Sequence, residues 1–222
     1  MLASEIISNV RTVLNDSTGV HWTDPELLGW INDAQLTVAI VRPDSVSATE
    51  SITLSAGSKQ SIPATGIRLL DVIRNTGGRA IRIVERETLD LFDPAWHTAK
   101  PSTSIKHYVY DNRVPMDFYV YPPASAGQQV EITYSKMPTK VTAASDAVAI
   151  PEIYKDIMVN YVLFRAYSKD AEHAANAGLA STYLQILNSL TGAKLSKDVA
   201  FQPSLNVRGD VPNQLAIQTG GV

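Results

Sequence analysis

The sequence lacks cysteine altogether. This absence excludes disulfide bonds, thiolate nucleophiles and cysteine-ligated metals, and it is typical of proteins that assemble in a reducing cytoplasm. Charged residues are also scarce, at 18% of the 222 residues, whereas apolar residues make up 45%. A globular protein with so little charge is expected to have part of its surface covered by partners.

The net charge is small, -3 at pH 7, so no long-range attraction to nucleic acid is expected. No apolar run approaches the ~20 residues that a membrane-spanning helix needs. The first residues, MLASEIISNVRTVLND, have neither the basic start nor the apolar centre of a signal peptide. We therefore expect a soluble, intracellular protein without membrane contact.

Motifs that carry chemistry are also missing. The sequence contains neither a glycine-rich phosphate loop nor a nucleophile elbow. Its four histidines are scattered, and Glu172 and His173 are adjacent, whereas metal ligands on one helix face lie three or four residues apart. No metal or cofactor is therefore expected.

One cluster imitates an acid–base site, because Asp90, Asp93 and His97 lie close together in the sequence. A hydrolase built on these three residues is one hypothesis. Asp93 precedes Pro94, however, and this dipeptide commonly starts a turn, which favours a structural role. We expect that the protein is not an enzyme.

The N-terminal part predicts two amphipathic helices. Apolar residues recur at helical spacing over residues 2–15, and again from Leu27 and Ile31 to the proline at position 43. Thr23 or Asp24 can cap the second helix, and Pro25 suits its first turn. These helices predict a hairpin with one face left to pack, and Leu27 and Ile31 are expected to lie in that packing.

From about residue 49 to residue 138 the pattern predicts six or seven short strands. SITLSAGSKQSIP and the stretch around Gly77 and Gly78 each predict a hairpin. Tyrosines at strand spacing are expected to pack a core or an interface rather than stack bases. They are Tyr108, Tyr110, Tyr119 and Tyr121.

Basic residues concentrate in the hairpin 66–86. They could contact DNA phosphates or acidic protein surfaces, or simply face solvent beside neighbouring carboxylates. They are Arg68, Arg74, Arg79, Arg82 and Arg86.

Helices return at Pro151. The first is apolar on nearly all sides, with Tyr161 and Phe164 expected to anchor its packing, and the second carries Leu179 and Tyr183 on one face up to about residue 190. From Thr191 no period remains, yet the segment is less polar than a typical flexible tail, so it predicts an extended arm that lies along another subunit. The apolar arm residues are Leu195, Val199, Phe201, Leu205 and Val207.

These elements predict an α+β fold, namely a four-helix bundle with an inserted small antiparallel β-barrel or sandwich and an extended C-terminal arm. The expected boundaries are 1–47 for the N-terminal hairpin of the bundle, 48–145 for the inserted β-domain, 146–190 for the C-terminal hairpin and 191–222 for the arm.

Three stretches resemble the head-to-tail adaptor proteins of short-tailed bacteriophages, also called tail tubular protein A. They are TDPELLGWINDAQ, IPEIYKDIMVNYVLFRAYSKDAE and HAANAGLASTYLQIL, and the resemblance runs from about residue 2 to residue 190. The resemblance implies a structural virion protein that forms a twelvefold ring beneath the capsid portal and lines the DNA exit channel. It further implies that the bundle and arm bind the portal and that the β-domain faces the tail nozzle and fibres.

The same resemblance implies a place at the head–tail interface of the virion, reached after assembly in the host cytoplasm, with DNA passing through the lumen without sequence-specific binding. The alternative from the residues alone is a DNA-binding module that uses the arginine-bearing hairpin 66–86.

Overall fold

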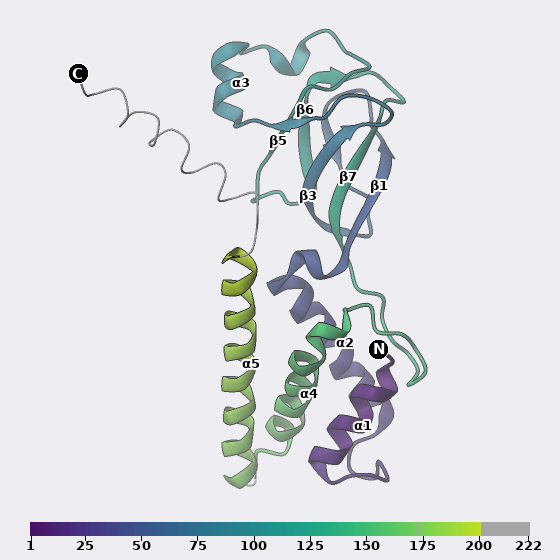
Figure 1. Ribbon diagram of the computed structural model, residues 1–222, viewed down its shortest axis with the longest axis vertical. Coiled ribbons are helices and arrows are strands. Elements are labelled where there is room, and N and C mark those ends of the chain that lie inside the picture. The colour runs from purple at the N-terminus through teal and green to yellow at the C-terminus, as the bar shows by residue number, and fades with distance from the viewer. Residues whose placement is uncertain (173, 201–222) are drawn as a thin grey trace, which may run out of the picture. The chain divides into compact units, whose positions relative to one another are not determined.

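The computed structural model describes residues 1–172 and 174–200. Within these residues the chain forms five α-helices, three 3-10 helices and seven strands (Figure 1). The α-helices are α1 (Ala3–Leu14), α2 (Asp24–Val41), α3 (Arg86–Phe92), α4 (Lys155–Lys169) and α5 (Ala174–Ala200). The 3-10 helices are η1 (Pro43–Val46), η2 (Trp96–Thr98) and η3 (Glu152–Tyr154). The strands are β1 (Ser47–Thr53), β2 (Gly57–Ser61), β3 (Gly66–Asn75), β4 (Arg82–Ile83), β5 (His107–Tyr110), β6 (Asp117–Ala124) and β7 (Gln129–Lys136).

Two compact units make up the structure, one spanning Met1–Val162 and one that begins at Leu163. The first unit contains α1 to α3, all strands and the start of α4, whereas the second contains the end of α4 and all of α5.

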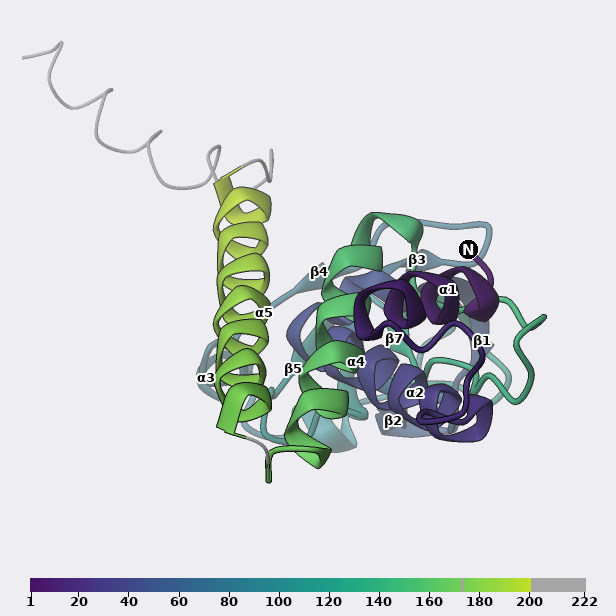
Figure 2. The same cartoon turned by 90° about the horizontal axis from the view of Figure 1, so that it is seen from below.

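The predicted N-terminal helices are confirmed. α1 buries Ile6 and Val10, α2 buries Leu27 and Ile31, and the two helices lie side by side (Figure 2). Thr23 occupies the position before α2 as predicted, but its side chain makes no capping hydrogen bond.

The strands form two sheets. The three-stranded sheet has the order β1-β7-β3, and the four-stranded sheet has the order β2-β6-β5-β4. A single cluster of buried side chains, including Leu69, Phe118 and Ile132, draws residues from both sheets. The apolar residues of alternating strands therefore share one core between the sheets.

β4 differs from the other strands because it pairs with β5 in parallel, with Arg82 opposite His107 and Ile83 opposite Tyr108. A parallel pair needs a long crossover connection rather than a tight turn. Here the crossover runs from residue 84 to residue 106 and carries α3 and η2.

The second unit pairs the end of α4 with α5. The rings of Tyr167 and Tyr183 stack with centroids 5.5 Å apart, and Asn176 donates a hydrogen bond of 2.9 Å to the carboxylate of Asp170. Ala180 and Leu187 are the buried apolar residues on α5.

The predicted fold class is wrong. The helices do not form a four-helix bundle, because α5 belongs to the second unit while α1, α2 and the start of α4 belong to the first. The β-region is likewise not the predicted small antiparallel barrel or sandwich, because its seven strands form two sheets, one of which contains a parallel pair. The division into four segments at residues 47, 145 and 190 stays a prediction.

The extended arm expected from Thr191 is also corrected over its first ten residues, because α5 continues to Ala200. Residues 191–200 contain no proline and only one glycine, and a single glycine costs a helix only about 1 kcal/mol. The lack of an apolar period therefore did not prevent helix formation.

Candidate interaction cavity

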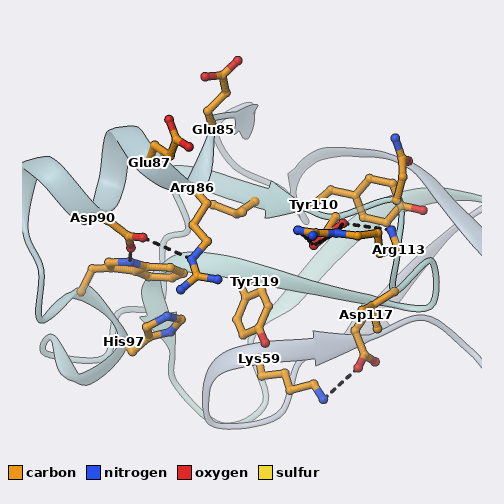
Figure 3. A pocket seen from close by; sticks show the side chains of 15 residues that line it. Lys59, Glu85, Arg86, Glu87, Asp90, His97, Tyr110, Arg113, Asp117 and Tyr119 are labelled. Atoms are coloured by element: carbon orange, nitrogen blue, oxygen red, sulfur yellow. Dashed lines mark hydrogen bonds and ion pairs between the residues drawn. The ribbon is translucent and has the colours of Figure 1, made fainter.

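A cavity of about 1000 Å³ lies in the first unit (Figure 3). It lies where the crossover helices α3 and η2 approach β2, β5 and β6. Its lining residues are Lys59, Glu85, Arg86, Glu87, Asp90, Trp96, His97, Val109, Tyr110, Asp111, Asn112, Arg113, Val114, Asp117 and Tyr119.

The floor of the cavity is aromatic. The His97 ring stacks on Trp96 with centroids 3.6 Å apart, and Tyr119 meets Trp96 edge to face at 6.1 Å. Trp96 is buried, together with Leu89 of α3. These contacts hold the crossover against the outer face of the four-stranded sheet. A well-packed segment rather than a loose loop therefore forms the wall of the cavity.

Ion pairs border this floor. Arg86 Nε lies 3.2 Å from Asp90 Oδ2, Arg113 Nη2 lies 2.8 Å from Asp111 Oδ2, and Lys59 Nζ lies 2.8 Å from Asp117 Oδ2 (Figure 3). Glu85 and Glu87 add two further carboxylates to the lining. Five carboxylates against three basic side chains give the cavity a formal charge of -2.

The three aspartates of the cavity are held in their ionised form. The hydrogen bond from Trp96 lowers the pKa of Asp90, and the Lys59 ammonium lowers the pKa of Asp117 by hydrogen bonding to it. The hydrogen bonds from Arg113 lower the pKa of Asp111 in the same way. A carboxylate with a lowered pKa is a poor proton donor at neutral pH, so this arrangement suits binding rather than acid–base catalysis.

The three residues of the hydrolase hypothesis have separate structural partners. Asp90 accepts a 2.8 Å hydrogen bond from Trp96 Nε1, and Asp93 accepts one of 3.2 Å from the Ala95 amide in the predicted turn. His97 Nδ1 lies 3.0 Å from Ser58 Oγ and hydrogen bonds with it. None of these contacts joins an aspartate to His97 as an acid–base pair would require.

The arginines of the hairpin 66–86 do not form one surface. Arg68 donates a 2.9 Å hydrogen bond to Asn112, Arg74 pairs with Glu131, and Arg86 lies at the cavity. Arg79 and Arg82 are exposed near His107, where burial first and then Arg79 lower the histidine pKa. Of these five arginines, only Arg79 and Arg82 have side chains that form no ion pair or hydrogen bond within the described residues.

The four tyrosines pack within the protein, as predicted. Tyr108 is buried and donates a 2.9 Å hydrogen bond to Asp71, and its burial raises its pKa. Tyr110 donates to the Pro115 carbonyl at 3.2 Å. Tyr119 and Tyr121 lie edge to face with Trp96 on the outer face of the sheet.

The residues proposed for helix packing lie in different environments. Leu27 and Ile31 are buried, Tyr161, Phe164 and Tyr183 are half-buried, and Leu179 is exposed. Their role in packing the helices stays a prediction. Two of the proposed arm residues, Leu195 and Val199, lie within α5. The other three, Phe201, Leu205 and Val207, lie outside the described residues.

Residues 1–172 and 174–200 contain no group of three side chains suited to hold a metal ion, and His173 lies outside them. No helix in that part of the chain combines the length and the apolar character needed to cross a bilayer.

The sequence did not predict the cavity, although it drew attention to Asp90 and His97. Lys59, Asp111, Arg113 and Asp117 come from separate strands and turns, and their individual spacing carries no signal. The charged residues Asp111, Arg113 and Asp117, with aromatic residues on both sides of them, are a trace of this surface in the sequence.

The described residues thus form an α+β protein with a cavity that is bordered by ion pairs over a packed aromatic floor, an arrangement typical of a binding site. The model of the SU10 adaptor protein family matches residues 1–208, and the chain belongs to this family. It is therefore a phage adaptor, a structural and non-enzymatic component of the virion that contacts other virion components. No curated protein matches the chain.

Proposed function

We propose that the protein is the head-to-tail adaptor of a short-tailed phage, of the tail tubular protein A kind. In this proposal it forms a ring between the capsid portal and the tail nozzle, similar to the twelvefold rings of that class. The family match over residues 1–208 carries the proposal, because it covers both units of the structure.

Exposed apolar side chains support an assembled state. Leu91 and Phe92 of α3 are 86% and 78% exposed, and Val20, Ile40 and Ile153 are each more than 70% exposed in the single subunit. Large apolar side chains scattered singly are ordinary on a surface, but an adjacent pair such as Leu91 and Phe92 is a feature of interaction sites.

α5 supports the same conclusion. Leu179, Leu184 and Ile186 are each about 40% exposed, while Ala180 and Leu187 are buried, so apolar residues lie on several sides of the helix. A helix with apolar residues on several sides is typically covered by more than one neighbour. In the proposed ring, these neighbours are adjacent subunits and the portal.

In this proposal the β-region faces the tail nozzle and fibres. The residues that bind the portal are the C-terminal Leu195, Val199, Phe201, Leu205 and Val207. The mild net charge of -3 suits a channel in which DNA slides without being held by phosphate contacts. Assembly takes place in the host cytoplasm before the adaptor enters the virion.

Electron microscopy of the purified protein, with and without its portal, tests this function. We expect single subunits alone and rings on the portal, because the portal supplies the template. If the protein and portal fail to associate, the adaptor function proposed here is wrong. Rings that form without the portal would contradict the proposed order of assembly.

A DNA-binding function is the second candidate, because Arg79 and Arg82 are exposed and form no ion pair within the described residues. It predicts that labelled DNA is retarded by low micromolar protein and released as salt rises. Absence of retardation at low salt would remove this candidate.

A further inference from the structure

One edge of the three-stranded sheet is open. β1 pairs with β7 on one side, and no strand among the described residues lies on its other side (Figure 1). The Leu54 amide donates to the Gln128 carbonyl at 2.7 Å, and in an antiparallel pair such bonded positions alternate along the strand. The amides and carbonyls of Thr49, Ser51 and Thr53 therefore point away from β7, toward the open edge.

β1 lacks most of the features that protect an edge strand from pairing with another chain. It is seven residues long, it contains neither proline nor lysine, and its register with β7 is free of bulges. Its one charged residue, Glu50, accepts a 2.9 Å hydrogen bond from the Tyr134 hydroxyl. The other sheet edges differ, because β2 has a register shift and carries Lys59, β4 has two residues, and the Ile81 amide bonds to β3.

The core beside this edge is incompletely covered. Ala48 and Ile52 of β1 contact the core that the two sheets share, yet both are only half-buried. Val130, which lies opposite Ile52 on β7, is fully buried. A further strand beside β1 would bury the rest of Ala48 and Ile52. Peptides that add to a sheet edge gain affinity from main-chain hydrogen bonds and specificity from alternate side chains.

The chain itself contains a segment with the chemistry of such a strand. Residues 213–219, NQLAIQT, lie between Pro212 and Gly220, and Leu215 and Ile217 alternate with polar or small residues. A short alternation bounded by proline and glycine is typical of a strand with one apolar face. The segment carries no charge, which suits an edge with a single carboxylate.

The segment is able to reach another copy. It lies outside the described residues, which end at Ala200. Residues 201–212 join it to α5 and span at most about 40 Å when extended, which is more than the radius of a compact domain. The residues proposed to bind the portal end at Val207, so the two contacts use different parts of the chain.

We propose that residues 213–219 of one copy add as a strand to β1 of the neighbouring copy in the ring. The backbone of the segment pairs with the outward amides and carbonyls of β1, and Leu215 and Ile217 cover the half-buried Ile52. This inference rests on the ring of the proposed function, because the ring supplies the neighbour.

Hydrogen exchange of β1, followed by mass spectrometry, tests the contact in the free full chain and in rings assembled on the portal. The outward amides of Thr49, Ser51 and Thr53 are expected to exchange about tenfold more slowly in rings than in the free chain. In rings of the chain that ends at Val207, which keeps the residues proposed to bind the portal, this protection is expected to be lost.

Two pairs of substitutions in the full chain test the apolar face of the segment. Leu215→Ser with Ile217→Ser removes that face, and β1 is expected to exchange quickly in rings of this variant, because two apolar side chains no longer become buried. The matched control, Gln214→Ser with Gln218→Ser, changes as many residues on the other face and is expected to keep the protection.

Ser51→Pro tests the edge from the side of β1. Proline has no N–H, and because the Ser51 N–H points away from β7, the sheet keeps its own hydrogen bonds. Rings of this variant are expected to lose the slow exchange of Thr49 and Thr53. Ser51→Ala is its control, since it removes the same hydroxyl but keeps the N–H, and its rings are expected to stay protected. Thermal unfolding checks that both variants keep their fold.

Three results would overturn the inference while leaving the adaptor function intact. One is equal exchange of β1 in the free full chain and in rings. Another is protection in rings of the chain that ends at Val207, which would assign the cover of β1 to the portal or to another part of the neighbour. The third is protection that survives Leu215→Ser with Ile217→Ser. Failure of the unaltered protein to form rings on its portal would instead refute the proposed function itself.

Discussion

At the scale of single residues, Gln35 links the helical part of the first unit to the chain that leaves the sheets. Its side chain is buried within α2. The amide nitrogen donates to the Thr139 carbonyl at 3.2 Å, and the amide oxygen accepts from the Ala149 amide at 2.9 Å. Asn32, one turn earlier, makes a similar pair of hydrogen bonds with the backbone of Val141.

We expect Gln35→Ala to lower the free energy of unfolding by about 2–4 kcal/mol, because two backbone groups lose their hydrogen-bond partner and the buried side chain leaves a cavity. Urea unfolding followed by circular dichroism measures this loss. Gln185→Ala is the control, since Gln185 is exposed on α5 and alanine is a good helix former. Equal stability of the two variants would show that the Gln35 hydrogen bonds contribute little.

The apolar face of α2 was predictable from the sequence, whereas the role of Gln35 was not. Leu27 and Ile31 recur at helical spacing, and a local pattern suffices to assign them to the interior. The partners of Gln35 are 104 and 114 residues away along the chain, and no local pattern reveals them. Asn75 is a similar case, because it is buried and bonds to the backbone of Ile105, 30 residues away.

At the scale of elements, α5 pairs with the end of α4 in the second unit. The stacked rings of Tyr167 and Tyr183 are the main aromatic contact described between them. We expect Tyr183→Ala to destabilise the pairing by about 1–3 kcal/mol, through lost apolar burial and lost ring stacking. Hydrogen exchange of the α5 amides measures this, and it should become faster while exchange in β7 is unchanged.

Leu184→Ala is the control for that prediction, because Leu184 is the adjacent apolar residue of α5 and is 39% exposed. It should change the exchange of α5 far less than Tyr183→Ala does. If the two variants accelerate exchange equally, the stacked tyrosines are not what holds the helix pair.

Strands were predicted more successfully than their pairing. The sequence predicted a hairpin at SITLSAGSKQSIP, but β1 pairs with β7 and β2 pairs with β6 in the other sheet, so this hairpin is wrong. After Gly77 the chain pairs briefly with β3 and then leaves to join β5 as β4. Alternation identifies a strand and its buried face, but the choice of neighbour depends on the core that both sheets share.

At the scale of the whole molecule, the predicted bundle is wrong because apolar periodicity shows that a helix packs but does not identify the element that it packs against. Four amphipathic or apolar helices flank a β-region, and a four-helix bundle is the simplest way to bury them. In the structure, α5 instead leaves three of its large apolar residues about 40% exposed. A subunit that completes its packing with other copies need not bury every apolar face by itself.

The cavity was beyond prediction for a related reason. Its charges come from α3, β2 and the chain from the end of β5 to the start of β6. Lys59 and Asp117, which form an ion pair, are 58 residues apart in the sequence. The sequence suggested an acid–base site for Asp90 and His97, with a turn at Asp93 as the alternative. Their actual roles, holding Trp96 and joining Ser58, follow only from the parallel crossover that places α3 and η2 over the sheet.

The C-terminal segment binds the portal in the proposed function, and this role can be tested by truncation. A chain that ends at Ala200 keeps all of α5 but lacks Phe201, Leu205 and Val207. We expect it to fold with unchanged thermal stability and to bind the portal at least tenfold more weakly, since buried apolar side chains contribute about 1.5–3 kcal/mol each. Sedimentation of portal with labelled adaptor measures the binding.

The control for that truncation is a chain that ends at Val207, which keeps the three apolar residues and removes the more polar end of the sequence. It should bind the portal nearly as well as the full chain, because the apolar contacts are retained. Full portal binding by the chain that ends at Ala200 would contradict the assignment of these residues, and portal attachment would then have to come from the helices alone.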